Sequence, residues 1–294
     1  MTILVGYVQG EGGAGGVQLG AMLAESLHTD LVVATVVPRP WTTPSPAKVD
    51  AEFVAWTDNV VERAHAEVTE YMQIYPPQLR WRFTRLDHRT ASSALLSYAQ
   101  EIDADALVVS STGDGQLGQI VVGSTADSLL HRSTVPVGLS PRGYRSPKDG
   151  LLKRVTVATA AAGSADVSVI QRARELSDRM DAALRVVTFA VRGGAMYPPL
   201  VGISTEDAVV DQWKSQATEA HRQLVTDGVI DSRTPCLVAS GRGWREAVDA
   251  VDWLDGEVLF IGSTREGLLA RVFIGTRATK LIRHSPVPVV VLPR

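Results

Sequence analysis

The sequence predicts an α/β fold: two doubly wound, Rossmann-like domains, each built on a five-stranded parallel sheet and related by a pseudo-two-fold axis. Three observations lead to this prediction. The chain repeats itself over the length of a whole domain, each copy alternates apolar strands with helical segments, and the strands are continuous apolar runs. A length of 294 residues also fits two domains of ordinary size.

The repeat is clearest at the carboxyl end of each copy. The stretch that ends at Arg142 aligns without a gap with the stretch that ends at Arg294, 152 positions later (142 to 294). Residues 3–6 align with 155–158 at the same offset. A period of this length indicates duplication of a domain and not a solenoid of short units. Residues 143–153 are polar with Pro and Gly, so we predict domains at 1–142 and 153–294 joined by a linker at 143–152.

The first copy begins with a buried strand at 3–8 and a helix at 17–27, where apolar residues recur at i, i+3 and i+4. A second strand, rich in β-branched residues, follows at 31–37. The remaining predicted elements are a helix at 51–72, a strand at 80–86, a helix at 90–102, a strand at 106–111, a helix at 124–132 and a strand at 135–141.

The second copy repeats this order. Its predicted strands lie at 154–159, 184–191, 236–240, 258–263 and 287–293, with helices near 209–225 and 245–254. Continuous apolar strands separated by helices are typical of a parallel sheet that is covered on both faces. Right-handed crossovers then make each copy doubly wound.

Composition excludes several functions. Lys and Arg number 29 against 32 Asp and Glu, and no dense basic run suggests a nucleic-acid partner. No apolar run approaches the ~20 residues that span a bilayer, and the first residues lack the features of a signal peptide. Cys236 is the single cysteine, which fits a reducing compartment, so we expect a cytoplasmic protein. The six histidines are scattered, so no metal site is predicted.

A glycine-rich turn follows the first strand. Gly10, Gly12 and Gly15 form G-x-G-x-x-G, which in a dinucleotide-binding enzyme would receive a pyrophosphate. However, residues 38–40 read Pro-Arg-Pro where such enzymes carry an acidic residue after the second strand, and 160–166 of the second copy holds one glycine. We therefore predict that the turn lets strand and helix approach closely. A nicotinamide-dependent oxidoreductase is the least favoured alternative, and we expect no NAD or NADP to bind.

A second candidate site is the loop after the fourth strand. It reads Ser110-x2-Gly113-x9-Gly123-Ser124 in the first copy and Gly262-x2-Arg265-x9-Gly275-Thr276 in the second, each followed by a helix and a V-P-V strand. This pattern resembles the G-x2-G-x9-G-[ST] loop of the universal stress protein family. Each copy keeps three of the four family positions and loses a different one, and the resemblance covers nearly the whole chain twice.

The resemblance implies a stress-response protein: a non-catalytic regulatory or protective module that acts through a protein partner and binds adenine nucleotide weakly at best. ATP would contact Ser110, Gly113, Gly123 and Ser124, and in the second copy Gly262, Gly275 and Thr276. Gly113 and Gly123 are expected to permit close backbone approach and positive φ, so that successive N–H groups point at phosphate oxygens. Ser124 and Thr276 would either cap a helix or contact a phosphate.

Two departures weaken the expected site. Nucleotide-binding members carry an acidic residue where this chain has Val8 and Ala160, and Arg265 replaces a glycine of the loop. We therefore expect ATP in the first copy only. No catalytic residues can be assembled from the sequence, and an ATP-binding switch with weak hydrolysis is the alternative from another class.

The last strand of each copy, at 135–141 and 287–293, pairs across a two-fold axis in this family. The resemblance thus implies a pseudo-dimer within one chain, with a homodimer of chains left open. The alternative is that Pro136 and Pro288 leave each strand as a protected edge.

Overall fold

The computed structural model describes residues 2–10, 13–39, 49–159, 164–191, 203–263 and 276–293, with side chains left out at 49–50, 164–166, 203–210 and 276. The chain forms two compact units, residues 1–151 and 152–292, and each is described by itself.

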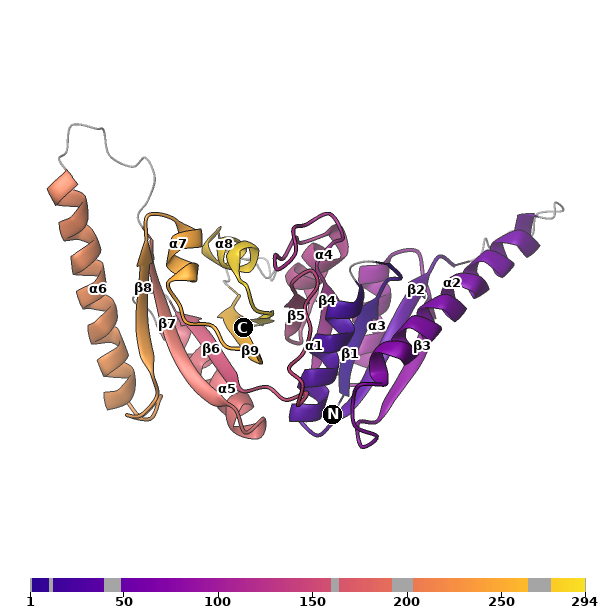
Figure 1. Ribbon diagram of the computed structural model, residues 1–294, viewed down its shortest axis with the longest axis horizontal. Helices are drawn as coiled ribbons and strands as arrows, with labels where there is room; N and C mark the ends of the chain where they lie inside the picture. Colours follow the sequence, from indigo (N-terminus) through magenta and orange to yellow (C-terminus); the bar gives the residue numbers. More distant parts are fainter. Residues whose placement is uncertain are drawn as a thin grey trace. The chain divides into compact units, whose positions relative to one another are not determined.

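The first unit alternates strands and helices along the whole of its length (Figure 1). Its elements are β1 (Thr2–Tyr7), α1 (Gly13–Ser26), β2 (Asp30–Val37), α2 (Val49–Met72), β3 (Trp81–Asp87), α3 (Ala91–Glu101), β4 (Ala106–Ser110), α4 (Ser124–Arg132) and β5 (Val137–Ser140).

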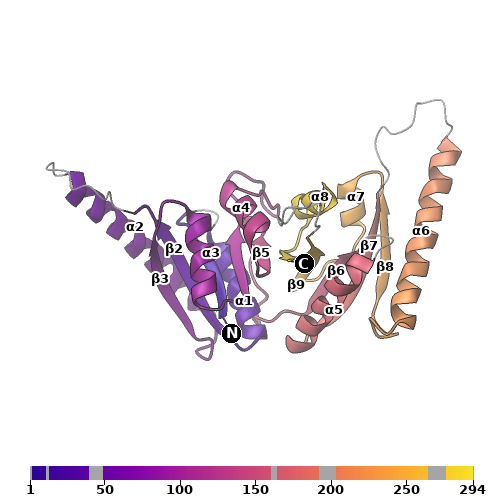
Figure 2. The ribbon, with the colours of Figure 1, turned by 180° about the vertical axis from the view of Figure 1, so that it is seen from behind.

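The five strands of this unit are parallel in the order β3-β2-β1-β4-β5. Helix α1 packs against α2, and α3 packs against α4. The first pair lies in front of the sheet in Figure 1, and α3 comes to the front in the reverse view of Figure 2. The central strand β1 is covered on both faces, since Ile3, Leu4 and Val5 are fully buried. Burial on both sides explains the continuous apolar run in its sequence.

The second unit repeats the architecture. Its elements are β6 (Arg154–Thr159), α5 (Ser164–Arg179), β7 (Ala183–Val191), α6 (Ile203–Thr226), β8 (Cys236–Gly241), α7 (Trp244–Asp249), β9 (Glu257–Gly262), α8 (Thr276–His284) and β10 (Val289–Leu292). The strands are again parallel, in the order β8-β7-β6-β9-β10. The prediction of two doubly wound units with five parallel strands each is confirmed. The pseudo-two-fold relation between them stays a prediction.

Three helices differ from their predicted extent by four residues or more. Helix α6 begins at Ile203 and not near 209. Helix α1 begins at Gly13, four residues before the predicted start, so three glycines of the glycine-rich turn lie in its first turns. Helix α7 ends at Asp249 and not at 254. The chain leaves the helix there, and Val251 packs into a buried cluster with Val187 and Ala239, with Trp253 against it.

The polar segment at 143–151 packs on the first unit. Gln18 of α1 is 2% exposed, and its side-chain carbonyl accepts hydrogen bonds from the Ser146 hydroxyl (2.7 Å) and the Tyr75 hydroxyl (3.0 Å). The Tyr144 hydroxyl contacts the Met22 sulfur at 3.3 Å. These contacts fix the segment to α1. The predicted boundaries at 142 and 153 stay a prediction.

Among the described residues, no helix is both long and apolar enough to cross a membrane.

Candidate functional site

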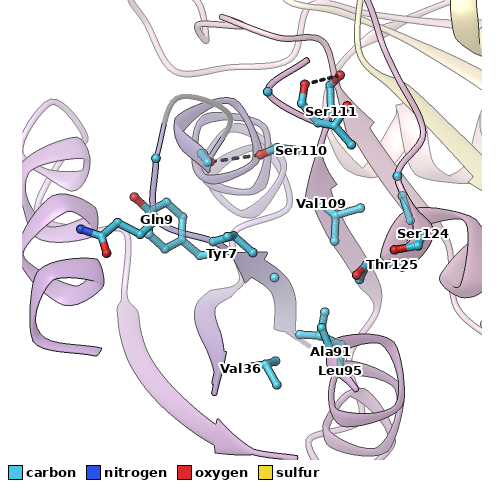
Figure 3. Close-up of a pocket in the computed structure, with 18 of the residues that line it drawn as sticks. Tyr7, Gln9, Val36, Ala91, Leu95, Val109, Ser110, Ser111, Ser124 and Thr125 are labelled. Carbon is cyan, nitrogen blue, oxygen red and sulfur yellow. Dashed lines mark hydrogen bonds between the residues drawn. The ribbon is translucent and has the colours of Figure 1, made fainter. Parts of the chain in front are cut away.

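A pocket of about 380 Å³ opens in the first unit at the carboxyl ends of β1, β2 and β4 (Figure 3). The chain passes from β1 to β2 on one side, whereas β4 pairs with β1 on the other. Ligands of open α/β sheets bind at such a switch in strand order, because the connecting loops diverge there and leave a crevice. The position in the fold therefore marks this pocket as the candidate site.

The two glycine loops of the sequence are two walls of this one pocket. The turn after β1 contributes Val8, Gln9, Gly10 and Gly13, and the loop after β4 contributes residues 111–113 and 123–126. They were expected to be competing sites with different ligands. The switch in strand order brings them together, because β1 and β4 are neighbours.

All four residues predicted for the first site, namely Ser110, Gly113, Gly123 and Ser124, line the pocket. Their contact with a ligand stays a prediction. In the second unit, Gly262 is the last residue of β9 and Thr276 the first of α8. The side chain of Thr276 and all of Ala160, Arg265 and Gly275 lie outside the described residues.

The expectation of positive φ at Gly113 and Gly123 is wrong. Gly123 has φ −82°, and Gly113 is not among the described glycines with positive φ, whereas Gly118 of the same loop has φ +78°. Gly123 is needed for space, since a Cβ there would lie 2.6 Å from the Thr112 methyl carbon. Around Gly113 a Cβ would meet nothing within 4 Å.

Ser124 does not cap its helix. The N-cap of α4 is Gly123 in an extended conformation, without a side-chain hydrogen bond. Ser124 is the first helical residue and is exposed, and its hydroxyl makes no hydrogen bond within the described residues. Of the two roles left open, capping is not what the structure shows. The helix N-terminus and the Ser124 hydroxyl both remain available to a ligand.

Ser110 is engaged elsewhere. Its Oγ accepts a hydrogen bond from the Gly16 N–H at 2.9 Å and donates one to the Gly13 carbonyl at 3.1 Å. The residue that replaces a family glycine therefore anchors the start of α1 on the end of β4.

The glycines at the start of α1 serve close packing, as predicted. A Cβ on Gly16 would lie 2.6 Å from Ser110 Oγ, one on Gly15 2.9 Å from Ser140 Oγ, and one on Gly13 2.5 Å from a Tyr7 ring carbon. The helix thus rests directly on the ends of β1, β4 and β5. These close contacts explain why glycines stand at these positions of the turn. Gly12 lies outside the described residues.

A carboxylate borders the pocket without lining it. Glu67 of α2 accepts a short hydrogen bond from the Tyr7 hydroxyl and another from the Gln9 amide at 3.1 Å. Burial, with the neighbouring Glu67 carboxylate, raises the pKa of Tyr7 well above its usual range. Val8, where the family has its acidic residue, is 74% exposed. The acidic group near the end of β1 therefore comes from a different element.

Sequence reasoning missed the apolar wall of the pocket. Val36 at the end of β2, Ala91 and Leu95 on α3, and Val109 on β4 line it (Figure 3). The signal was present: residues at the carboxyl ends of strands next to the switch point meet there. None of the described side chains that line the pocket is Lys, Arg, His, Asp or Glu. In the described part of the chain, no three His, Cys, Asp or Glu side chains gather as metal ligands.

Comparisons with known proteins cover the full chain or one half of it. A universal stress protein of Mycobacterium tuberculosis H37Rv is 41% identical over 293 residues, covering 100% of both chains. The solved universal stress protein of Archaeoglobus fulgidus DSM 4304 covers 100% of this chain and 98% of its own, with 17% identity and a TM-score of 0.63. A universal stress protein solved in complex with cAMP covers 49% of this chain and 98% of its own, with 19% identity and a TM-score of 0.34. Residues 1–140 and 152–293 each match the Universal stress protein family, so the chain belongs to that family and carries its domain twice.

Proposed function

We propose that this protein is a non-catalytic regulatory or protective module of the stress response, with one ligand-responsive pocket in its first unit. A nucleoside-containing ligand would bind there weakly and bias the contact with a protein partner. The observation that supports this most is the pocket at the switch point, where the N-terminus of α4 is open to a ligand.

Weak binding of ATP follows from the pocket lining. A triphosphate carries several negative charges, and proteins that hold one tightly supply Lys, Arg or a metal ion. The described lining offers hydroxyls and backbone N–H groups without a cationic side chain. Helix α4 also carries Asp127 in its first turn, and this negative charge opposes additional phosphate charge.

The absence of catalysis is part of the proposal. Tyr7 is the one ionisable side chain among the lining residues described, and its hydroxyl donates to Glu67. A tyrosine phenol is already protonated at neutral pH, and the raised pKa of Tyr7 moves it further from acting as a base. The alternative, an ATP-binding switch with weak hydrolysis, is favoured only by the open N-terminus of α4.

Titration calorimetry of ATP against wild type, Gly123→Val and Gly275→Val tests the proposal. We expect wild type and Gly275→Val to bind with equal, weak affinity and Gly123→Val to lose binding, because its side chain would collide with Thr112 and close the loop. Tight binding abolished only by Gly275→Val would place the site in the second unit and contradict the proposal.

A further inference from the structure

Two helix N-termini approach the end of β4, and they differ in how their amides are used. In α4 the N-cap is Gly123, and no side chain caps the helix within the described residues. In α1 the Gly16 N–H donates to the hydroxyl of Ser110, which sits at the end of β4 and lines the pocket. At the N-terminus of α1 a side chain of the protein therefore accepts an amide hydrogen bond, whereas at the N-terminus of α4 no side chain does.

The geometry also fixes the proton of Ser110. Its hydroxyl hydrogen is given to the Gly13 carbonyl oxygen at 3.1 Å, so it cannot be donated to a phosphate oxygen. In Figure 3 the dashed line from Ser110 leads into α1 and not toward Ser124 and Thr125. Ser110 lines the pocket and the buried Gly16 does not, so the Gly16 N–H is closed to a ligand while Ser110 Oγ accepts its hydrogen bond.

The hydroxyl groups that are open to a ligand gather at the other end. Thr112 Oγ1 is not one of them, because it is fully buried, although it has no hydrogen-bond partner among the described residues. The hydroxyls of Ser124 and Thr125 lie beside the start of α4, on the far side of the pocket from Gln9 (Figure 3). The Ser111 hydroxyl, by contrast, is used inside the loop, where it accepts the Val121 N–H at 2.8 Å.

We propose that Ser110 is the specificity-determining residue of this pocket and restricts it to nucleosides that carry no more than one phosphate. The base and ribose match the apolar wall of Val36, Ala91 and Leu95, and a single phosphate matches the open end of α4. A longer phosphate chain needs a second cluster of donors, and at α1 Ser110 presents an acceptor. This inference rests on the proposed function, since it names the ligand class of the same pocket.

Calorimetric titrations of adenosine, AMP and ATP against wild type, Ser110→Gly and Ser124→Ala test the inference. In wild type, AMP should bind at least as tightly as ATP. Ser110→Gly removes the acceptor and frees the Gly16 N–H, so ATP should gain about tenfold relative to AMP, the effect of one hydrogen bond to a charged group. Ser124→Ala, the matched control, should weaken AMP and ATP alike. Ser110→Ala replaces Ser110→Gly if the glycine variant does not fold.

Amide exchange at Gly16 gives a readout without any ligand. It should be faster in Ser110→Gly and Ser110→Ala than in wild type, because the amide loses its acceptor. If wild type prefers ATP to AMP and Ser110→Gly leaves that ratio unchanged, the inference is overturned while the proposed function stands. If none of the three ligands binds any variant, both are overturned. Unchanged Gly16 exchange in both variants would show that Ser110 does not cap α1.

Discussion

Glu67 of the first unit and His221 of the second each join the long helix of their unit to the sheet, but from positions that do not correspond in the repeat. At the offset of 152 residues Glu67 corresponds to Glu219 and His221 to Thr69. Glu67 accepts a hydrogen bond from Tyr7, the last residue of β1. His221 Nε2 lies 2.9 Å from the Thr188 hydroxyl.

The second repeat extends this contact to the matching strand. The Thr188 hydroxyl lies 2.8 Å from that of Thr159, the last residue of β6, which corresponds to Tyr7 at the repeat offset. Both units thus have a polar link from the long helix to the end of the central strand, made by residues that do not correspond in the repeat. It starts from a carboxylate in the first unit and from an imidazole in the second.

The histidine makes the second unit sensitive to acid. His221 is 6% exposed, and burial lowers its pKa below the ordinary 6.5. The unfolded chain therefore binds a proton at a higher pH than the folded chain. Stability should be complete above pH ~6.5 and fall as the pH drops from there to the folded pKa, by about 1.4 kcal/mol for each pH unit that separates the pKa values of the folded and unfolded chains.

Urea unfolding at pH 7.5 and 5.5 checks this expectation. His221→Gln, which can keep a hydrogen bond to Thr188, should lose less stability between the two pH values than wild type. His65→Gln, at an exposed position, is the control and should behave as wild type. Equal losses in wild type and His221→Gln would show that the buried imidazole does not titrate across folding.

The segment at 143–151 should be released by a single change in α1. Gln18→Ala removes the acceptor shared by Ser146 and Tyr75 and leaves buried hydroxyls without it, at a cost of about 1–3 kcal/mol. Trypsin should then cleave after Arg145 and Lys148 faster than in wild type. The exposed Gln78→Ala is the matched control. Unchanged cleavage in Gln18→Ala would mean that other contacts hold the segment.

Much of the fold could be predicted because the evidence for it is spread over many residues. The predicted helix at 124–132 coincides with α4, and the predicted strand at 154–159 coincides with β6. The strands could be predicted because a strand that is buried on both faces needs a continuous run of apolar residues. The end of α7 could not be predicted, because the contacts of Val251 and Trp253 that end it come from a strand distant in sequence.

The candidate site could be predicted only in part. Its four loop residues follow from the motif, and all of them line the pocket. The role of Ser110 in holding α1 could not be read from the motif, because it depends on Gly13 and Gly16, which lie far away in the sequence. Glu67 was missed for the same reason: α2 brings it to Tyr7 and Gln9 only in the folded chain.

A buried ionic cluster should stabilise the second unit alone. Glu257, 1% exposed, contacts Arg154 at 2.6 Å and Arg185 at 2.7 Å and also accepts a hydrogen bond from Thr156. Glu257→Gln leaves the two guanidinium groups without their countercharge and should lower the free energy of unfolding by about 3–5 kcal/mol. The measurement is chemical denaturation followed by tryptophan fluorescence, to which Trp253, against Arg185, contributes.

The exposed Asp255→Asn is the control for this cluster and should change little. The first repeat shows what the cluster adds, since it has Asp105 and Val32 at the positions of Glu257 and Arg185. Asp105→Asn should therefore cost less than Glu257→Gln. Equal costs would mean that the charge of the cluster contributes little.

Two glycine substitutions should separate packing from binding. Gly20→Ala would place a Cβ 2.2 Å from a methyl group of Val5, between α1 and β1, and should cost about 1–3 kcal/mol of stability. Gly113→Ala meets open space and no positive φ, so the free energy of unfolding should stay within about 0.5 kcal/mol of wild type. Both values come from denaturant unfolding.

Because Gly113 lines the pocket and is not needed for the fold, AMP titration of Gly113→Ala measures only what its methyl group does to the ligand. A large loss of stability in Gly113→Ala would show that the loop after β4 packs more tightly than this geometry allows.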